Sequence, residues 1–445
     1  MASMALQQLF QSVSNVAVFK RRNWQDQLCD LLRLKDESSM LKLADEILVN
    51  YEGYDQAAQV DFFRYLLTQF RADSDLLAEA TIAYQNDPSP ANVQRLNAAS
   101  TPGRRALFEI FNMTAEGTMR LVQMRADLLG LLREHPELAP VDTDLQVLFS
   151  AWFNRGFLSL ERISWDTPAF VLERLMKYEA VHEICGWDDL QKRVSSGRRC
   201  FAFFHPALPS EPIIFVQVAL VSGLSSSVDD IIRSEEAPLD EADADTAIFY
   251  SISNCQLGLR GIAFGDLLIK QVVEQLTEEL PHIKTFATLS PVPGFGKWLS
   301  KIRDVDAKSD TKALPFVNAA ERDLLDGLLA DKAGDWASSE SHCAKLQPLL
   351  ERLCAHYMVI AKSGEQPLDP VSRFHLRNGA RLERLNWLGD RSQKGLKQSH
   401  GLLVNYVYDS AVVTRNHERY VYENSVICSN SIASLAKSPI NRKFG

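Results

Sequence analysis

The spacing of hydrophobic residues divides the chain into a helical first part and a mixed second part. From about residue 24 to residue 150, apolar residues recur at intervals of three and four, the period of an amphipathic helix. Prolines separate many of these segments, as expected where helices end or begin. The short links between them predict a helical bundle or a stacked array over residues 1–150. The helical segments are 26–32, 41–48, 59–70, 74–85, 91–98, 103–111 and 114–134.

The second part, residues 151–445, alternates between helix and strand patterns. It begins with residues 152–183, which still have a helical pattern, and residues 319–361 are helical again. Residues 229–245 hold eight acids and one base, which is typical of a solvated excursion between strands. Runs rich in β-branched and aromatic residues predict strands at 199–204, 213–220, 247–253, 285–290 and 402–408.

One stretch, residues 247–298, combines a strand, a glycine-rich loop, a helix, a second strand and a proline-framed turn. A glycine loop that opens a helix can hold a phosphate, because the backbone N–H groups approach the anion closely and the helix N-terminus adds positive potential. Arg260 within the loop can add a charge-assisted contact. The glycines alone are equally consistent with a tight corner. The spacing is neither that of a dinucleotide fold nor that of a nucleoside-triphosphate loop.

Two side chains are candidates for chemistry, although each also has a structural reading. Asp369 can cap a helix that starts at Pro370, and His375 falls on its second turn between two apolar neighbours. By its pattern alone, this histidine is more typical of a core or capping residue. Ser290 precedes a proline and has the pattern of a turn residue, and no Gly-x-Ser-x-Gly motif surrounds it.

Composition limits the classes of function that the chain can have. Hydrophobic residues make up 46% and charged residues 24% of the chain, as in a globular protein. The net charge of −9 argues against nonspecific binding to nucleic acid or an anionic membrane, and no apolar run reaches membrane-spanning length. The scattered cysteines form no Cys-x-x-Cys pair, and the acidic segment lacks calcium-loop spacing, so we expect no metal site and no disulfide framework.

The cysteine pattern also bears on location. It fits a reducing cytoplasm best. The N-terminus is basic and lacks acids before Asp26, which weakly resembles a mitochondrial presequence. We therefore expect a cytoplasmic protein, with the mitochondrial matrix as the alternative for a eukaryotic source.

Several motifs together resemble the malonyl-CoA decarboxylase family. The likeness runs through the last two-thirds of the chain and extends more loosely over the first third. It implies an α+β protein, in which an N-terminal all-helical domain of residues 1–150 serves oligomerisation. Residues 151–445 would form a catalytic, CoA-binding mixed-sheet domain of the acyl-CoA N-acyltransferase-like (GNAT-type) fold. The motifs are Phe249-Tyr-Ser-Ile-Ser253, Gly258-Leu-Arg-Gly261, Phe286-Ala-Thr-Leu-Ser-Pro-Val-Pro-Gly-Phe295, Phe374-His-Leu-Arg-Asn-Gly-Ala380 and Gly401-Leu-Leu-Val-Asn-Tyr-Val-Tyr408.

The resemblance also implies which residues act. It makes Ser290 the group that positions the substrate, His375 the acid–base group and Tyr408 an auxiliary donor. Some family members carry a glutamate where this chain has Ala263, so any role of that carboxylate is absent here or supplied elsewhere. The residues expected to bind the CoA diphosphate are Arg260, Gly261, Ile262, Ala263, Phe264, Gly265 and Asp266.

The implied reaction is the decarboxylation of malonyl-CoA to acetyl-CoA and CO2, which regulates the malonyl-CoA level in fatty-acid metabolism. Decarboxylation places electrons on C2 and the thioester oxygen, and donors in a dry pocket can stabilise them without a metal or organic cofactor. The family also suggests a homotetramer. Two alternatives stay open at this point: a GNAT-type acyl-CoA N-acyltransferase, which would need an acceptor amine, and a sensor that binds CoA thioesters without turnover.

Overall fold

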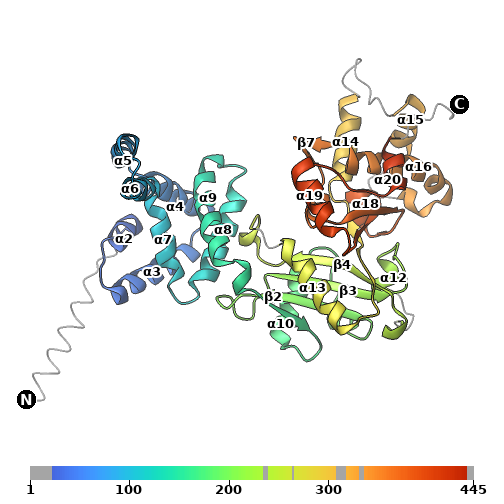
Figure 1. Ribbon diagram of the computed structural model, residues 1–445, viewed down its shortest axis with the longest axis horizontal. Helices are drawn as coiled ribbons and strands as arrows, with labels where there is room; N and C mark the ends of the chain where they lie inside the picture. The colour runs from blue at the N-terminus through green and yellow to red at the C-terminus, as the bar shows by residue number, and fades with distance from the viewer. Residues whose placement is uncertain (1–22, 234–238, 263–264, 307–316, 330–334, 438–445) are drawn as a thin grey trace, which may run out of the picture. The chain divides into compact units, whose positions relative to one another are not determined.

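The computed structural model describes the chain except residues 1–22, 234–238, 263–264, 307–316, 330–334 and 438–445 (Figure 1). It divides into two compact units. The first contains residues 1–157 together with 206–209 and 256–262, and the second contains residues 158–205, 210–255 and 263–445. Among the described residues, no helix combines the length and the apolar character needed to cross a membrane.

The first unit is built from helices, as the apolar periodicity predicts. Aspartates at the N-caps of three of them, Asp36, Asp55 and Asp73, accept hydrogen bonds from free backbone N–H groups of the first turn. The helices are α2 (Trp24–Leu31), α3 (Glu37–Glu52), α4 (Gln56–Gln69), α5 (Ser74–Asn86), α6 (Pro90–Ser100), α7 (Gly103–Asn112), α8 (Gly117–Leu131) and α9 (Ala139–Trp152), with a 3-10 turn η1 (Pro136–Leu138).

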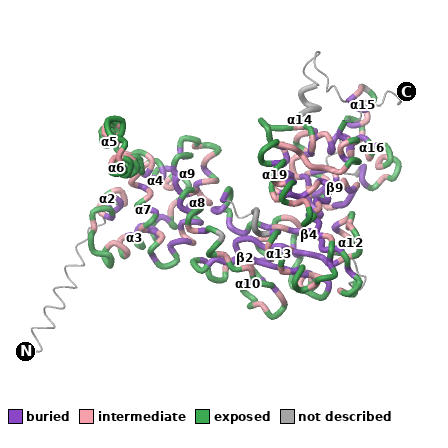
Figure 2. The backbone as a smooth tube through the Cα atoms, in the orientation of Figure 1, coloured by how far each residue is buried: buried purple, intermediate pink, exposed green. Residues whose placement is uncertain are grey.

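Helices α5 and α6 differ from the other helices of this unit because almost none of their residues are buried. Only Ala80 is buried in α5 and no residue is buried in α6, as the exposed colouring in Figure 2 shows. Leu76, Ile82 and Val93 are exposed apolar side chains on this pair. The pair therefore contributes little buried apolar surface to the core of the first unit.

The segment 256–262 joins the helical unit through a close contact with α8. It contains the short 3-10 turn η4 (Leu257–Leu259). A Cβ atom on Gly258 would lie 1.7 Å from the carbonyl oxygen of Val122, and Arg125 Nη1 donates to the Gly258 carbonyl at 2.5 Å. Gly258 is therefore explained by backbone packing on α8, which neither the phosphate-binding nor the tight-corner interpretation of the loop predicted.

The second unit is centred on an eight-stranded sheet of order β1-β2-β3-β4-β5-β10-β6, with β9 also paired to β10. The pairings are antiparallel except that β4 runs parallel to β5. The strands are β1 (Ser159–Ile163), β2 (Arg198–Phe204), β3 (Ile214–Val221), β4 (Thr246–Asn254), β5 (Thr285–Thr288), β6 (Ser290–Pro291), β9 (Arg381–Asn386) and β10 (Leu403–Tyr408); β7 (Lys362–Ser363) and β8 (Gln366–Pro367) form a separate hairpin.

Helices and short turns complete the second unit. Figure 1 shows α13 against one face of the sheet, where its residues Ile269, Val272 and Leu276 are buried. The helices are α10 (Ala169–Tyr178), α11 (Trp187–Arg193), α12 (Asp229–Ile232), α13 (Gly265–Glu279), α14 (Phe295–Asp306), α15 (Ala319–Leu328), α16 (Glu340–Val359), α17 (Pro370–Arg377), α18 (Gln393–Ser399), α19 (Val413–Glu423) and α20 (Asn430–Lys437); the 3-10 turns are η2 (Arg155–Phe157), η3 (Glu241–Asp243) and η5 (Asp335–Ser338).

The predicted α+β fold class, a helical N-terminal part followed by a mixed-sheet domain, is confirmed, but individual strands correct the prediction. The helical pattern assigned to residues 152–183 is wrong at β1, which pairs with β2 at the edge of the sheet. Four of the five residues of β1 are not buried, so the strand has no apolar run that a sequence pattern could detect. The single strand predicted at 285–290 is divided into β5 and β6, and β9 was not predicted.

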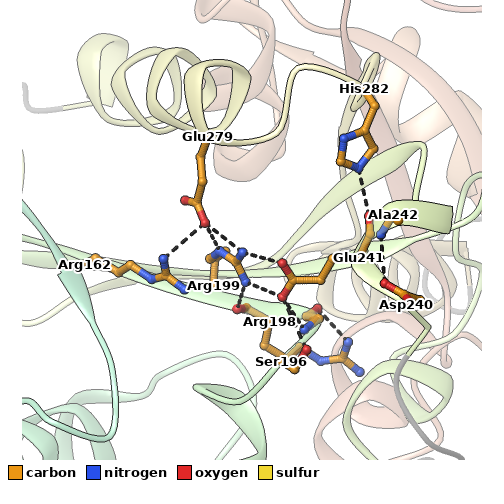
Figure 3. Close-up of polar contacts among 10 residues, drawn as sticks. Arg162, Ser196, Arg198, Arg199, Asp240, Glu241, Ala242, Glu279 and His282 are labelled. Atoms are coloured by element: carbon orange, nitrogen blue, oxygen red, sulfur yellow. Dashed lines mark hydrogen bonds and ion pairs between the residues drawn. The ribbon is translucent and has the colours of Figure 1, made fainter.

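An ion-pair cluster fastens the end of the acidic segment to the sheet. Arg199 on β2 donates to Glu241 at 2.8 Å and to Glu279, at the end of α13, at 2.7 Å (Figure 3). The hydrogen bond from Arg199 lowers the pKa of Glu241 to about 2. The acidic segment therefore has one fixed end at this cluster.

Candidate active site

The candidate site lies at a break in the sheet. Strand β10 pairs with β5 at one end, where Tyr408 lies opposite Phe286, and with β6 at the other, where Val404 lies opposite Ser290. Between these two ladders, the side chain of Asn405 takes the place of a backbone partner and donates from Nδ2 to the Thr288 carbonyl at 2.9 Å. The break separates Ser290 from the regular β5 ladder.

Helix α17 carries the second component of the site. Asp369 is its N-cap and accepts from the Ser372 backbone N–H at 2.9 Å, and Pro370 occupies the first helical position. Gly379 has φ of +79° just past the end of the helix, a left-handed conformation that is common at helix C-termini. His375 lies on this helix with 2% of its surface exposed.

The structure brings the three predicted residues into one hydrogen-bonded chain. Ser290 Oγ lies 3.0 Å from His375 Nε2, and His375 Nδ1 lies 2.8 Å from the Tyr408 hydroxyl. The ring of Tyr406 stacks on the imidazole with 4.4 Å between centroids. The three polar side chains are all buried. An imidazole held on both nitrogens and on one face has a fixed orientation, which proton transfer requires.

Burial controls the protonation of these hydrogen-bonded side chains. It lowers the pKa of His375 to about 3 and raises the pKa of Tyr408 well above its usual value. In the protein alone, His375 is therefore a neutral imidazole between two hydroxyl groups.

Asp369 connects the two components of the site, which the sequence did not indicate beyond its capping role. Burial raises the pKa of its carboxyl to about 6, although backbone hydrogen bonds from Ser372 and Gly294 oppose this rise. Gly294 belongs to the turn that follows Ser290, and a Cβ there would lie 2.1 Å from the Tyr357 hydroxyl. Asp369 thus holds the first turn of the His375 helix against the Ser290 turn.

Sequence reasoning missed two further polar residues beside the site, Thr288 and Asn405. Both are fully buried. Ser290 Oγ donates to Thr288 Oγ1 at 2.8 Å. A threonine two positions before Ser290 was the available signal, because residues i and i+2 of an extended chain share one face.

The predicted CoA loop is described in part. Gly261 is exposed, has φ of +85°, and has open space around the position of a Cβ atom. Arg260 and Ile262 lie beside it in the same segment, while Ala263 and Phe264 lie outside the described residues. Gly265 and Asp266 form the first residues of α13. Gly261 is thus the loop glycine that the backbone conformation requires.

A mixed sheet with one parallel pair that carries a buried serine–histidine–tyrosine chain has the make-up of an enzyme active site. Family models make the assignment specific. The model of the malonyl-CoA decarboxylase C-terminal domain matches residues 156–444, and that of the N-terminal domain matches residues 70–153. The chain belongs to the malonyl-CoA decarboxylase family.

Individual relatives agree with this assignment. The mitochondrial malonyl-CoA decarboxylase of Rattus norvegicus is 36% identical over 413 residues, which are 86% of this chain and 83% of that protein. The crystal structure of malonyl-CoA decarboxylase from Rhodopseudomonas palustris is 42% identical, with a TM-score of 0.85 and coverage of 92% of this chain and 98% of that one. The enzyme from Agrobacterium vitis is 43% identical, with a TM-score of 0.86 and coverage of 94% and 100%.

These relationships decide among the functions left open by the sequence. The chain is a carboxy-lyase that acts on malonyl-CoA, and decarboxylation to acetyl-CoA and CO2 is its activity. They do not support the N-acyltransferase alternative.

Proposed function

We propose that Ser290, His375 and Tyr408 carry out the decarboxylation. The observation that supports this assignment most strongly is the buried imidazole of His375, with Ser290 3.0 Å from one nitrogen and Tyr408 2.8 Å from the other. No charged side chain contributes to the shift in its pKa, which arises from burial alone. Such a dry, uncharged setting strengthens each hydrogen bond to a developing negative charge.

Ser290 is the group that orients the substrate. The bond between C2 and the carboxylate breaks readily only when the carboxylate is rotated out of the thioester plane, because its electron pair then overlaps with the carbonyl. A hydroxyl that fixes this rotation accelerates the step through orientation. The electron pair moves to C2 and the thioester oxygen, and CO2 leaves.

His375 then supplies a proton to C2. The neutral ring gives its one N–H proton to the enolate carbon, directly, through Ser290 or through a water molecule, while the Tyr408 hydroxyl passes its proton to the other ring nitrogen, so that the ring stays neutral. Tyr408, whose raised pKa keeps its hydroxyl protonated, hydrogen-bonds to the other ring nitrogen. One proton from solvent restores the protein after each turnover, so that malonyl-CoA and a proton yield acetyl-CoA and CO2.

The loop from Arg260 to Asp266 binds the CoA diphosphate in this proposal. Gly261 supplies a left-handed backbone with open space above it, and α13 begins at Gly265. Backbone N–H groups at a helix start favour a phosphate, and Arg260 adds a charge-assisted contact. Ile262, Ala263, Phe264 and Asp266 are the other residues that we assign to diphosphate binding.

Residues 1–150 serve oligomerisation in this proposal, and residues 151–445 form the catalytic, CoA-binding domain. The exposed apolar side chains of α5 and α6 support a self-associating surface, and a homotetramer is the assembly we expect. Sedimentation of the purified protein measures the number of subunits. The rat and mouse relatives are named mitochondrial, so we propose the mitochondrial matrix as well as the cytoplasm as locations for this protein.

Incubation of purified protein with malonyl-CoA tests the assignment of the site. Wild type releases CO2 and acetyl-CoA in equal amounts, with or without an amine acceptor and with or without a chelator, because the proposed chemistry uses no metal or organic cofactor. Ser290→Ala and His375→Asn should release both far more slowly while still binding CoA. Wild-type rates in both variants would refute the proposed roles.

A further inference from the structure

The site contains a fourth hydroxyl group, that of Thr288. Ser290 Oγ donates to Thr288 Oγ1 at 2.8 Å, and the backbone N–H of Tyr406 donates to the same oxygen at 3.4 Å. A threonine hydroxyl has two acceptor lone pairs, and here both receive a donor. Thr288 therefore acts as an acceptor toward Ser290.

This contact determines the direction of the whole hydrogen-bonded chain. In the protein without substrate, the single hydrogen of the Ser290 hydroxyl points to Thr288, so at the 3.0 Å contact with His375 the serine oxygen accepts. Nε2 of His375 then carries the ring proton. A neutral imidazole has one protonated nitrogen, so Nδ1 is bare and accepts from the Tyr408 hydroxyl at 2.8 Å.

Burial supports the same direction. The pKa of Tyr408 lies well above its usual value, so its hydroxyl keeps the proton that it donates to Nδ1. The lowered pKa of His375 excludes a second ring proton at neutral pH. Each donor in the chain from Tyr408 through His375 and Ser290 to Thr288 consequently has one acceptor.

The backbone of Thr288 is itself held in place at the break in the sheet. Asn405 Nδ2 donates to the Thr288 carbonyl at 2.9 Å and to the Ser225 carbonyl at 3.1 Å. Asn405 Oδ1 accepts from Asn386 Nδ2 at 2.9 Å. All of the hydrogen-bonding groups of the Asn405 amide are thus used, and one of its N–H groups holds the strand end that presents Thr288.

We propose that Thr288 is a positioning residue, which orients the Ser290 hydroxyl and thereby sets His375 in the tautomer protonated at Nε2. The proposal rests on the roles of Ser290 and His375 given above. In a serine nucleophile activated by histidine, the serine donates to the imidazole. Here the direction is reversed: the imidazole presents its proton toward Ser290, where the enolate carbon must be protonated, and Ser290 is not deprotonated for attack.

Substitutions of Thr288 separate its hydroxyl from its packing. Thr288→Val keeps the branched shape and removes the acceptor, whereas Thr288→Ser keeps the acceptor. We expect Thr288→Val to lower kcat roughly tenfold with KM changed less than about twofold, and Thr288→Ser to stay within about threefold of wild type. A wild-type kcat in Thr288→Val, or an equal loss in Thr288→Ser, would overturn the proposal.

Thr246→Val is the matched control. Thr246 is also a buried threonine of this sheet, and its hydroxyl donates to Asp245 rather than to a site residue. Its variant loses a buried threonine hydroxyl in the same way and should retain wild-type kcat. If Thr246→Val lost as much kcat as Thr288→Val, the loss would come from a general disturbance of the sheet and not from the contact with Ser290.

The tautomer can be measured directly in wild type, which keeps the proposal testable even if Thr288→Val does not fold. Ring-15N histidine labelling distinguishes a protonated nitrogen from a bare one, and the His375 signals are those missing from His375→Asn. We expect a protonated Nε2 and a bare Nδ1; the opposite assignment would contradict the proposal. If Ser290→Ala and His375→Asn kept wild-type rates, the proposed function would fail instead.

Discussion

Ser290 and His375 are 85 residues apart in the chain, yet Ser290 Oγ lies 3.0 Å from His375 Nε2. Two structural features create this contact. The division of the predicted strand into β5 and β6 presents Ser290, and the capped start of α17 presents His375. Asp369 links the two through hydrogen bonds with Ser372 and Gly294.

The contribution of Ser290 is measurable by Ser290→Ala. Loss of one positioned hydrogen bond to a charged group is worth on the order of 1.5–3 kcal/mol, so kcat should fall roughly ten- to a hundredfold. Steady-state kinetics on malonyl-CoA, with calorimetry of CoA binding, should show that affinity is largely kept. An unchanged kcat would remove Ser290 from the mechanism.

His375→Asn should lower the rate by roughly a hundredfold or more, the scale of a lost general acid, with little change in CoA affinity. The variant keeps a polar side chain but cannot shuttle a proton. Tyr408 would be the next candidate for the acid if the variant retained the wild-type rate.

The pH behaviour of His375 follows from its burial. With a pKa lowered to about 3, the ring in the free protein stays neutral, and its NMR signals should not titrate between about pH 5 and pH 8. A histidine with an ordinary pKa would gain a proton as the pH falls through this range. Titration of the His375 signals near pH 6.5 would show that water reaches the imidazole and that it is less buried than we infer.

Substitutions in the glycine loop should weaken the binding of every CoA ligand alike. Gly261→Val forces a side chain into the left-handed region and covers the open backbone, and Arg260→Gln removes a charge without a change in the backbone. Calorimetry should show weaker binding of CoA, acetyl-CoA and malonyl-CoA in both variants. Selective loss of malonyl-CoA would mean that the loop contacts the acyl group.

Gly258→Ala is the contrasting variant for this loop. Its Cβ would meet the Val122 carbonyl oxygen at 1.7 Å, so this change should lower the stability of the helical unit. A loss of CoA affinity in Gly258→Ala without a loss of stability would contradict the packing role assigned to it.

Asp369 should make stability depend on pH. Its folded pKa of about 6 exceeds the ordinary value of 3.8, so its favourable contribution is complete below pH 3.8 and is lost as the pH rises through 6. The loss amounts to about 3 kcal/mol. Asp369→Asn keeps a good N-cap and cannot ionise, so its stability relative to wild type should increase between about pH 4 and pH 7.

Asp36→Asn is the control for this measurement. Asp36 also caps a helix, but hydrogen bonding to Ser39 lowers its pKa, so its contribution to stability is lost as the pH falls. Its variant should therefore show the opposite trend in chemical denaturation. A pH-independent difference between Asp369→Asn and wild type would mean that the Asp369 carboxyl is not protonated in the folded protein.

Local patterns predicted most elements but not the details that form the site. The period of three and four along residues 24–150 reports one buried face of each helix, and Asp369-Pro370 predicts the start of α17 because capping is a local interaction. The interruption between β5 and β6 depends on β10, which lies more than a hundred residues further along the chain. Such pairing leaves no mark in the apolar pattern of residues 285–290.

The site itself was predicted through motifs and not through periodicity. His375 and Ser290 have the local patterns of a capping residue and a turn residue, and only their resemblance to a family singled them out. Thr288 and Asn405 have the apolar neighbours of ordinary strand residues. Their polar partners come from distant segments, so the hydrogen bonds that define their roles become visible only in three dimensions.

A double-mutant cycle tests most directly the central claim that Ser290 and His375 act as one unit on malonyl-CoA. The values of kcat for wild type, Ser290→Ala, His375→Asn and the double variant give the coupling between the two side chains. Residues that act together are strongly non-additive, so the double variant should be little slower than the slower single variant. A double variant whose loss equals the product of the two single losses would show that Ser290 and His375 act independently, and would contradict this account.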